Sequence, residues 1–284
     1  LTHAALAKNE RALGTAMEQL STGSKINSAS DDAAGLAMAA KFTAQIKGLD
    51  MAVKNANDAV SMISTAEGAL DEVATMLQRM RELAVQSSNG TVTAEDRDYM
   101  DLEYQALNSE ITRIANNTQW NGENILDGTA GAGSGSSSSS VTFQVSANYT
   151  AGTPSNDVIE VDFGNLATAL GSTGSANVTG SDVDTQSNAT SAIGVLDAGI
   201  VAINTQRATF GAASNRLEHA VDNMTNIQNN AEASRSRIED TDYAETTSEL
   251  AKAQIIAQAG TAMLAQANQS PQNVLSLPVS YTHL

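Results

Sequence analysis

The chain has 284 residues, and 15 Lys and Arg side chains stand against 32 Asp and Glu, for a formal net charge of −17. This charge argues against nucleic-acid binding and against docking on anionic membranes, because both need a basic footprint. There is no Cys, which excludes disulfides, thiolate metal sites and a thiol nucleophile. Only 4% of residues are aromatic, so the apolar content is mostly aliphatic and suits long packed helices.

The first predicted element is a short helix over residues 1–20. An apolar stripe recurs along it every seven residues. The stripe consists of Leu6, Leu13 and Leu20. A polar break at residues 21–24 ends the pattern. Ser30, followed by Asp31 and Asp32, predicts the start of the next helix, with the Ser30 hydroxyl as its cap and the carboxylates at its positive end.

The second predicted helix is long, because apolar residues recur in alternating steps of three and four from residue 46 to residue 84. Such sustained heptads are typical of a coiled-coil seam. The predicted seam positions are Ile46, Leu49, Val53, Ala56, Val60, Ile63, Glu67, Leu70, Ala74, Leu77, Arg81 and Ala84. Asn89-Gly90 is a turn signal that ends this helix.

A third helix is predicted after Thr93, which forms a capping-box pattern with Asp96 in place of the usual Glu or Gln. One face of this helix is apolar. It carries Met100, Tyr104, Leu107, Ile111 and Ile114. Two Asn-Gly and Asp-Gly pairs, at residues 121–122 and 127–128, mark its end.

The middle of the chain differs in composition. Residues 131–140 are of low complexity, and no Lys or Arg occurs between Arg113 and Arg207. Two short runs alternate apolar and polar residues, which predicts two strands of a hairpin with a long connection. Their apolar members are Val141, Phe143, Val145, Ile159, Val161 and Phe163.

A fourth helix shows the same stepping over seven heptads. Its predicted seam is Ile193, Leu196, Ile200, Ile203, Arg207, Phe210, Ser214, Leu217, Val221, Met224, Gln228, Ala231, Arg235 and Ile238. The polar members weaken the seam but can fix its register. An acidic run at residues 239–242 interrupts it. The last helix, from about Tyr243 to Asn268, is rich in Ala, and Pro271 is expected to end it.

These elements predict a mainly α protein, in which the N- and C-terminal halves pair as a long antiparallel coiled coil or helical bundle with a small β-hairpin insertion. The two end helices have no thick apolar face, and isolated helices of their length are marginal in water. They are therefore expected to order when many copies pack, as in an open helical polymer. The candidate assembly residues are Leu6, Leu13, Leu20, Leu250, Ala257 and Leu264.

Several long motifs resemble the two terminal signatures of bacterial flagellin, in the family's order. The N-terminal motifs are residues 20–36 (LSTGSKINSASDDAAGL), 55–60 (NANDAV), 65–70 (TAEGAL) and 78–86 (QRMRELAVQ). The C-terminal motifs are residues 237–244 (RIEDTDYA) and 265–275 (AQANQSPQNVL). Residues 278–284 match nothing in the family, and its usual Ile-Asn-Thr-Asn-like start is absent.

The resemblance implies a subunit that polymerises into the flagellar filament for swimming motility. Residues 1–20 and 243–277 would be terminal helices of the inner filament tube, and residues 21–32 and 239–242 would be spoke linkers. Residues 33–128 and 185–238 would form a helical rod. Residues 129–184 would hold the β-hairpin and a variable Ser/Thr/Gly-rich surface insertion.

The resemblance also implies location and partners. The chain would be extracellular, exported without a cleavable signal peptide, and its partners would be copies of itself, an export chaperone and hook-associated proteins. The segment at residues 78–86 resembles the one that vertebrate Toll-like receptor 5 recognises in many flagellins. By position, the contacts would be Arg79, Leu83 and Glu103. Alternatively, Arg79 and Glu103 lie on a solvated face and Leu83 packs inside the rod or between subunits.

The sequence leaves other functions open beside a filament subunit. A hook–filament junction protein shares the terminal helices, and a flagellin-like cell-surface protein could bind glycans through the insertion. The insertion could carry O-linked glycans or be a plain surface loop. An enzyme is not expected: the three histidines are scattered, and no HExxH, GxSxG or P-loop motif occurs. No metal or other cofactor is expected, because the acidic runs at helix boundaries are explained as caps and linkers.

Overall fold

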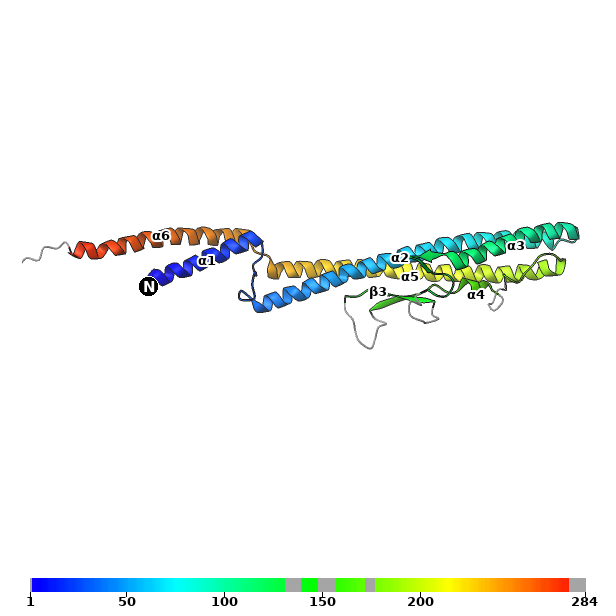
Figure 1. The fold of residues 1–284 in the computed structure, drawn as a ribbon, viewed down its shortest axis with the longest axis horizontal. Helices are drawn as coiled ribbons and strands as arrows, with labels where there is room; N and C mark the ends of the chain where they lie inside the picture. The colour runs from blue at the N-terminus through cyan, green and yellow to red at the C-terminus, as the bar shows by residue number, and fades with distance from the viewer. Residues whose placement is uncertain (1, 131–138, 148–156, 172–176, 276–284) are drawn as a thin grey trace, which may run out of the picture. The chain divides into compact units, whose positions relative to one another are not determined.

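The computed structural model describes residues 2–130, 139–147, 157–171 and 177–275 (Figure 1). The chain separates into two compact units, Leu1–Ile46 with Asn229–Leu284, and Lys47–Gln228. The elements of the described residues are α1 (Thr2–Thr22), α2 (Ala33–Ser87), α3 (Ala94–Asn117), β1 (Gln119–Trp120), β2 (Glu123–Asn124), β3 (Ser140–Gln144), β4 (Val158–Asp162), α4 (Leu166–Leu170), α5 (Gln186–Glu239) and α6 (Tyr243–Leu275). The predicted mainly α fold with a small β-hairpin is confirmed.

In the unit Lys47–Gln228, which we call the rod, α2 and α5 lie side by side and antiparallel. Polar contacts fix their register along the length of the rod. Gln228 Nε2 donates to Asp50 Oδ1 at 2.7 Å, and Arg81 Nε donates to Asp197 Oδ1 at 2.6 Å. Between them, Arg207 pairs with Asp71 at 3.0 Å. As residue numbers on α2 rise, those on α5 fall, so the N- and C-terminal halves pair as predicted.

The buried seam of α2 inside the rod differs from the predicted one. One predicted series, spaced by seven, is buried: Leu49, Ala56, Ile63, Leu70, Leu77 and Ala84. In the second predicted series, Ala74 is buried, and Val53 and Val60 are half-buried and pack against the core. Glu67 is half-buried and Arg81 is exposed, so the prediction is wrong at Arg81. A third series, which was not predicted, is also buried. It consists of Ala52, Ala59, Ala66, Val73, Met80 and Ser87, all buried.

The α5 seam agrees better with the sequence. One series is buried: Leu196, Ile203, Phe210, Leu217 and Met224 in the rod, then Ala231 in the other unit. The alternate positions, from Ile193 to Gln228, are half-buried. The half-buried series includes Arg207, whose guanidinium lies 3.0 Å from Asp71 and 3.9 Å from Glu67 of α2. This polar seam position therefore meets acidic side chains on the partner helix.

Helix α3 begins with the predicted capping box. Asp96 N donates to the Thr93 hydroxyl at 3.2 Å, and Thr93 N donates to Asp96 Oδ2 at 3.3 Å, so two free backbone donors are satisfied. Of the predicted apolar face, Tyr104 and Ile111 are buried and the other three members are half-buried. Helix α3 thus covers a side of the rod core that α5 does not fill.

Both β segments in the rod are two-stranded antiparallel hairpins. The predicted hairpin is confirmed: β3 pairs with β4, with Val141 opposite Val161 and Phe143 opposite Ile159. The hairpin of β1 and β2 was not predicted. Its turn is Asn121-Gly122, with φ of 51° and 84°, and an Asn-Gly pair with two positive φ angles is the preferred two-residue hairpin turn. This turn closes a hairpin after α3 rather than only ending the helix.

Two predicted helix boundaries are wrong. The cap of α2 is Asp32, whose Oδ1 accepts from the backbone N–H groups of Ala34 and Gly35. Ser30 does not cap, because its hydroxyl bonds Ser28 at 2.6 Å. Pro271 does not end the last helix, since α6 runs to Leu275. Proline has a φ compatible with a helix, so a helix can include it at the loss of one backbone hydrogen bond.

Candidate functional site

The unit Leu1–Ile46 with Asn229–Leu284 contains an antiparallel pair of helices, α1 and α6, which we call the terminal pair. A Cβ built on Gly260 of α6 would meet Leu6 Cδ1 at 3.1 Å, so the glycine lets the leucine approach closely. Nearer the linkers, the Tyr243 hydroxyl donates to Leu20 O at 3.3 Å. The C-terminal end of α1 thus meets the start of α6, and the N-terminal part of α1 meets the middle of α6.

The fully buried part of the terminal pair is thin. Its buried members are small or polar: Asn9, Ala16, Thr246 and Ala253. Asn9 Nδ2 donates to Ala253 O at 2.7 Å, a buried bond that joins the two helices. The sequence analysis missed Asn9, because a polar residue beside a leucine stripe carries no periodic signal. The candidate assembly residues Leu6, Leu13, Leu20, Leu250, Ala257 and Leu264 are all half-buried within the single chain.

Large apolar side chains lie exposed on the terminal pair. Ile255 and Met263 of α6 are each 66% exposed, and Met17 of α1 is 54% exposed. Ile256 beside them is also exposed. Adjacent exposed apolar residues on one helix mark an interaction surface more strongly than a scattered leucine does. The sequence did contain a sign of this surface. Ile255 and Ile256 are adjacent, and two adjacent helical residues cannot both lie in one narrow seam.

The two linkers, residues 21–32 after α1 and residues 239–242 before α6, are held together by backbone hydrogen bonds. Lys25 N donates to Glu239 O at 2.6 Å, and Thr241 N donates to Gly23 O at 3.0 Å. Residues Ser24 and Asp240 form an antiparallel bridge between these bonds. Gly23, with a φ of 75°, ends α1 in the left-handed conformation that glycine favours. The two predicted spoke segments therefore contact each other directly.

The loop that leads into α2 is organised by a carboxylate. Asp31 Oδ2 accepts from Ser28 N at 2.9 Å and from Asn27 N at 3.1 Å. These backbone donors lower the pKa of Asp31, because they stabilise its charged form. The acidic run before α2 thus serves a turn and a helix cap, as the sequence interpretation of caps and linkers expected.

The candidate receptor residues lie in the rod, and the structure separates them. Arg79 of α2 is half-exposed and donates to Glu103 Oε1 of α3 at 2.9 Å and to Glu82 at 3.0 Å. Both carboxylates raise the pKa of Arg79, Glu103 most. Leu83 is only 2% exposed and belongs to the rod core. Leu83 is therefore not an exposed contact beside the guanidinium: it packs inside the rod, although it belongs to neither of the two buried series of α2.

No ion site emerges among the described residues, where no group of three or more His, Asp or Glu side chains is placed to hold a metal. Of the helices that the structure describes, none is long and apolar enough to cross a membrane.

The N-terminal and C-terminal regions of the chain each match a known family. A family model of the bacterial flagellin N-terminal helical region matches residues 1–131, and one of the C-terminal helical region matches residues 193–277. A flagellin from Halalkalibacterium halodurans is 45% identical over 92% of this chain and 90% of its own length. The two matched regions contain the whole terminal pair and most of the rod helices.

Solved structures agree on the fold. The crystal structure of Bacillus cereus flagellin is 33% identical, covers 60% of this chain and 88% of its own, and has a TM-score of 0.50. A putative flagellar hook-associated protein from Vibrio parahaemolyticus has a TM-score of 0.58, covering 74% of this chain and all of its own. Its 16% identity shows a shared fold alone, so a junction role is not favoured over a filament role. The chain belongs to the bacterial flagellin family, the self-assembling structural subunits of the flagellar filament outside the cell.

Proposed function

We propose that the terminal pair is the surface through which this filament subunit assembles, with residues 1–20 and 243–277 forming the inner tube of the filament. The observation that carries the proposal is the set of exposed apolar side chains Met17, Ile255, Ile256 and Met263 beside a thin buried interface. Residues 21–32 and 239–242 would be spokes, residues 33–128 and 185–238 the rod, and residues 129–184 the β-hairpin with a variable surface insertion.

Energetics favour this assignment. Burying one Ile or Met side chain fully is worth about 1.5–3 kcal/mol, and four such side chains remain 46–66% exposed in the single chain. A neighbouring copy that covers them would stabilise both the contact and the helices that carry it. The half-buried leucines of α1, such as Leu6 and Leu13, then hold the pair together within one subunit, while the exposed set joins subunits.

Seeded growth tests the proposal. The double variant Ile255→Ser/Met263→Ser is mixed as monomer with short filament fragments from the source cells, and growth is followed by sedimentation and negative-stain electron microscopy. We expect elongation to be lost, while urea unfolding of the monomer rod is unchanged. The matched control is Val201→Ser on the rod, 64% exposed, which should still elongate. Equal elongation by the double variant and the control would contradict the assignment.

The same exposed face suits a protecting partner before assembly. We infer that an export chaperone covers the apolar side of α6, and that hook-associated proteins contact the terminal pair at the filament ends. Co-purification of the chaperone from the source cells should fall for Ile255→Ser/Met263→Ser and persist for Val201→Ser. Equal recovery with both variants would place the chaperone elsewhere.

A second proposal is recognition by Toll-like receptor 5 through Arg79 of α2 and Glu103 of α3, with the buried Leu83 supporting α2. The paired, half-exposed guanidinium and carboxylate support it, since arginine is enriched at binding hot spots. Receptor-reporter signalling should fall for Arg79→Ala. The chain offers a matched control in Arg113, an exposed arginine that pairs with Glu110 at 2.6 Å. If Arg79→Ala signals as well as Arg113→Ala, recognition by this pair is excluded.

A further inference from the structure

The nine methionines of the chain differ sharply in exposure. Three are buried in the rod core, and two more are half-buried against it. These five are Met62, Met80, Met224, Met76 and Met100. The other four are 48–66% exposed, namely Met17, Met38, Met51 and Met263. Because an oxidant reaches a methionine sulfur most readily at the surface, the fold sorts these side chains into reactive and protected ones.

Met263 lies in an exposed apolar strip on α6. Ile256, Ala259 and Met263 are spaced by three and four residues, so their side chains share one face of the helix, and all three are exposed. Ile256 belongs to the surface through which we propose that the subunit assembles. Methionine supplies a large and flexible apolar side chain that can adapt to a facing surface. Met263 therefore extends the apolar surface about two turns further along α6.

Met17 is the exposed methionine of α1. The Tyr243 hydroxyl, at the start of α6, donates to Leu20 O, which lies less than one turn beyond Met17. Met17 is therefore near the linkers. Met263 lies beyond Gly260, which meets the N-terminal part of α1. The two exposed sulfur atoms thus mark the two ends of the terminal pair, so both ends of the proposed assembly surface carry an oxidisable side chain.

Oxidation changes the chemistry of such a surface. When hydrogen peroxide reacts with methionine, a lone pair of the sulfur attacks one peroxide oxygen, an S–O bond forms, the O–O bond breaks and water leaves. The sulfur is oxidised and the peroxide is reduced. The product, methionine sulfoxide, is polar and disrupts apolar interfaces. Its oxygen needs a hydrogen-bond donor once it is buried, and the strip neighbours Ile256 and Ala259 have none in their side chains.

We propose that Met17 and Met263 are oxidation sites through which peroxide stops the free subunit from assembling, and that reduction of the two sulfoxides restores assembly. This inference rests on the assembly role proposed above for the terminal pair. Under that role other copies cover both sites in the filament, so the sites react before a subunit is incorporated. The methionines of the rod core are buried, so oxidation blocks joining without unfolding the rod.

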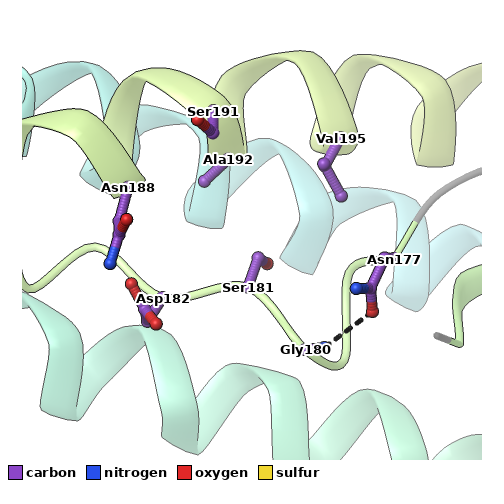
Figure 2. A pocket seen from close by; sticks show the side chains of 8 residues that line it. All are labelled: Asn177, Gly180, Ser181, Asp182, Asn188, Ser191, Ala192 and Val195. Carbon is purple, nitrogen blue, oxygen red and sulfur yellow. Dashed lines mark hydrogen bonds between the residues drawn. The ribbon is translucent and has the colours of Figure 1, made fainter.

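The segment before α5, residues 177–184, provides a reporter of the folded rod. Ser87 Oγ of α2 donates to Val183 O at 2.6 Å, and Val183 N donates to Asp101 Oδ1 of α3 at 3.0 Å. Figure 2 shows this segment along the start of α5, and none of the eight residues that line the pocket there is a methionine. Protection of the Val183 amide against hydrogen exchange therefore reports on the rod rather than on a reacting side chain.

Seeded growth after controlled oxidation tests the proposal. Monomer is treated with hydrogen peroxide until peptide mass spectrometry finds sulfoxide at the exposed methionines and not at the buried ones, and catalase then removes the peroxide. Elongation from untreated filament fragments is expressed relative to the same chain without treatment. For the natural chain we expect a fall of about tenfold or more, because a polar group is buried without a partner. Val183 protection should be unchanged, and methionine sulfoxide reductases with dithiothreitol should restore growth.

Two double variants locate the effect. Met17→Leu/Met263→Leu carries side chains that peroxide does not oxidise, so treatment should leave its growth close to that of its own untreated sample. The matched control Met38→Leu/Met51→Leu removes the other two exposed methionines, and its growth should fall as in the natural chain. The proposal is overturned by an equal fall in Met17→Leu/Met263→Leu and the natural chain, or by rescue in the control.

The natural chain decides the question without any variant. Undiminished growth with Met17 and Met263 both oxidised overturns the proposal, as does growth that is lost together with Val183 protection. If Met17→Leu/Met263→Leu does not grow before treatment, failure of the reductases to restore the natural chain overturns it. Failure of the assembly role itself has a different sign, because Ile255→Ser/Met263→Ser would then elongate without any oxidant.

Discussion

The rod and the terminal pair are built from the same heptad repeat, yet they bury it to different degrees. In the rod, α2 is buried on two series of positions, and the residues include large side chains such as Leu77 and Met80. In the terminal pair the buried side chains are mainly small, and Ile255 and Met263 stay two-thirds exposed. Three helices enclose a core, whereas two helices leave their outer faces open.

The difference shows which part of the molecule a single chain can fold by itself. The rod has a continuous cluster of buried apolar residues that runs from Leu49 of α2 to Met224 of α5, with Tyr104 and Phe163 inside it. The terminal pair has no comparable cluster among its described side chains. A subunit built this way has a complete rod core and an open terminal pair, which other copies would cover if the proposed assembly role holds.

The largest expected effect lies in the rod. Phe210→Ala removes a ring that is fully buried and lies 5.3 Å, centroid to centroid, from the ring of Phe163. We expect the free energy of unfolding to fall by about 3–5 kcal/mol, because the cavity adds to the lost apolar burial. Urea unfolding of the monomer followed by circular dichroism measures it. A loss below about 1 kcal/mol would mean that the rod core is as thin as the terminal pair, and Val201→Ala serves as the exposed control.

A smaller effect is expected in the terminal pair. Asn9→Ala removes the buried bond to Ala253 O, and we expect a loss of about 1 kcal/mol confined to the two end helices. Hydrogen exchange should show faster exchange in α1 and α6, with the rod amides unchanged. Equal acceleration in the rod would refute the view that the two units differ in stability. Thr15→Ala, whose hydroxyl bonds only its own helix at Arg11 O, is the matched control.

The smallest effect tests the corrected seam of α2. Arg81 was predicted inside the seam but is exposed and pairs with Asp197. Such a surface pair contributes about 0.2–1 kcal/mol and is screened by salt. Arg81→Ala should therefore change urea unfolding little, and the difference should shrink at high ionic strength. By contrast, Met80→Ala one residue earlier should cost about 2–5 kcal/mol. Similar losses for both variants would restore the predicted seam.

Much of the fold was readable from the sequence because it rests on period and local chemistry. The alternating steps of three and four located α2 and α5, the Thr93–Asp96 pair located the start of α3, and strand alternation located the two strands in which Val141 lies opposite Val161. These signals are local, so no knowledge of the partner helix is needed to see them.

What the sequence could not settle depends on partners. A buried series of Ala52, Ala59 and Ala66 is invisible to a hydrophobic pattern that weights large side chains, and it becomes buried only because α2 has neighbours on two sides. The same limit explains Leu83, which resembled a surface contact and is in the core. The docking of residues 177–184 was missed because they are held by side chains of α3 and by Ser87 of α2, which no spacing rule records.

The backbone bridge between the two linkers has a mechanical consequence. Its bonds, Lys25 N to Glu239 O and Thr241 N to Gly23 O, lie side by side across two antiparallel strands of chain. A pull directed along those strands loads both bonds at once, in shear, instead of opening them one after the other. A rotating flagellar filament transmits torque through every subunit. Two hydrogen bonds that are loaded together would resist rupture better than two bonds that are loaded one after the other.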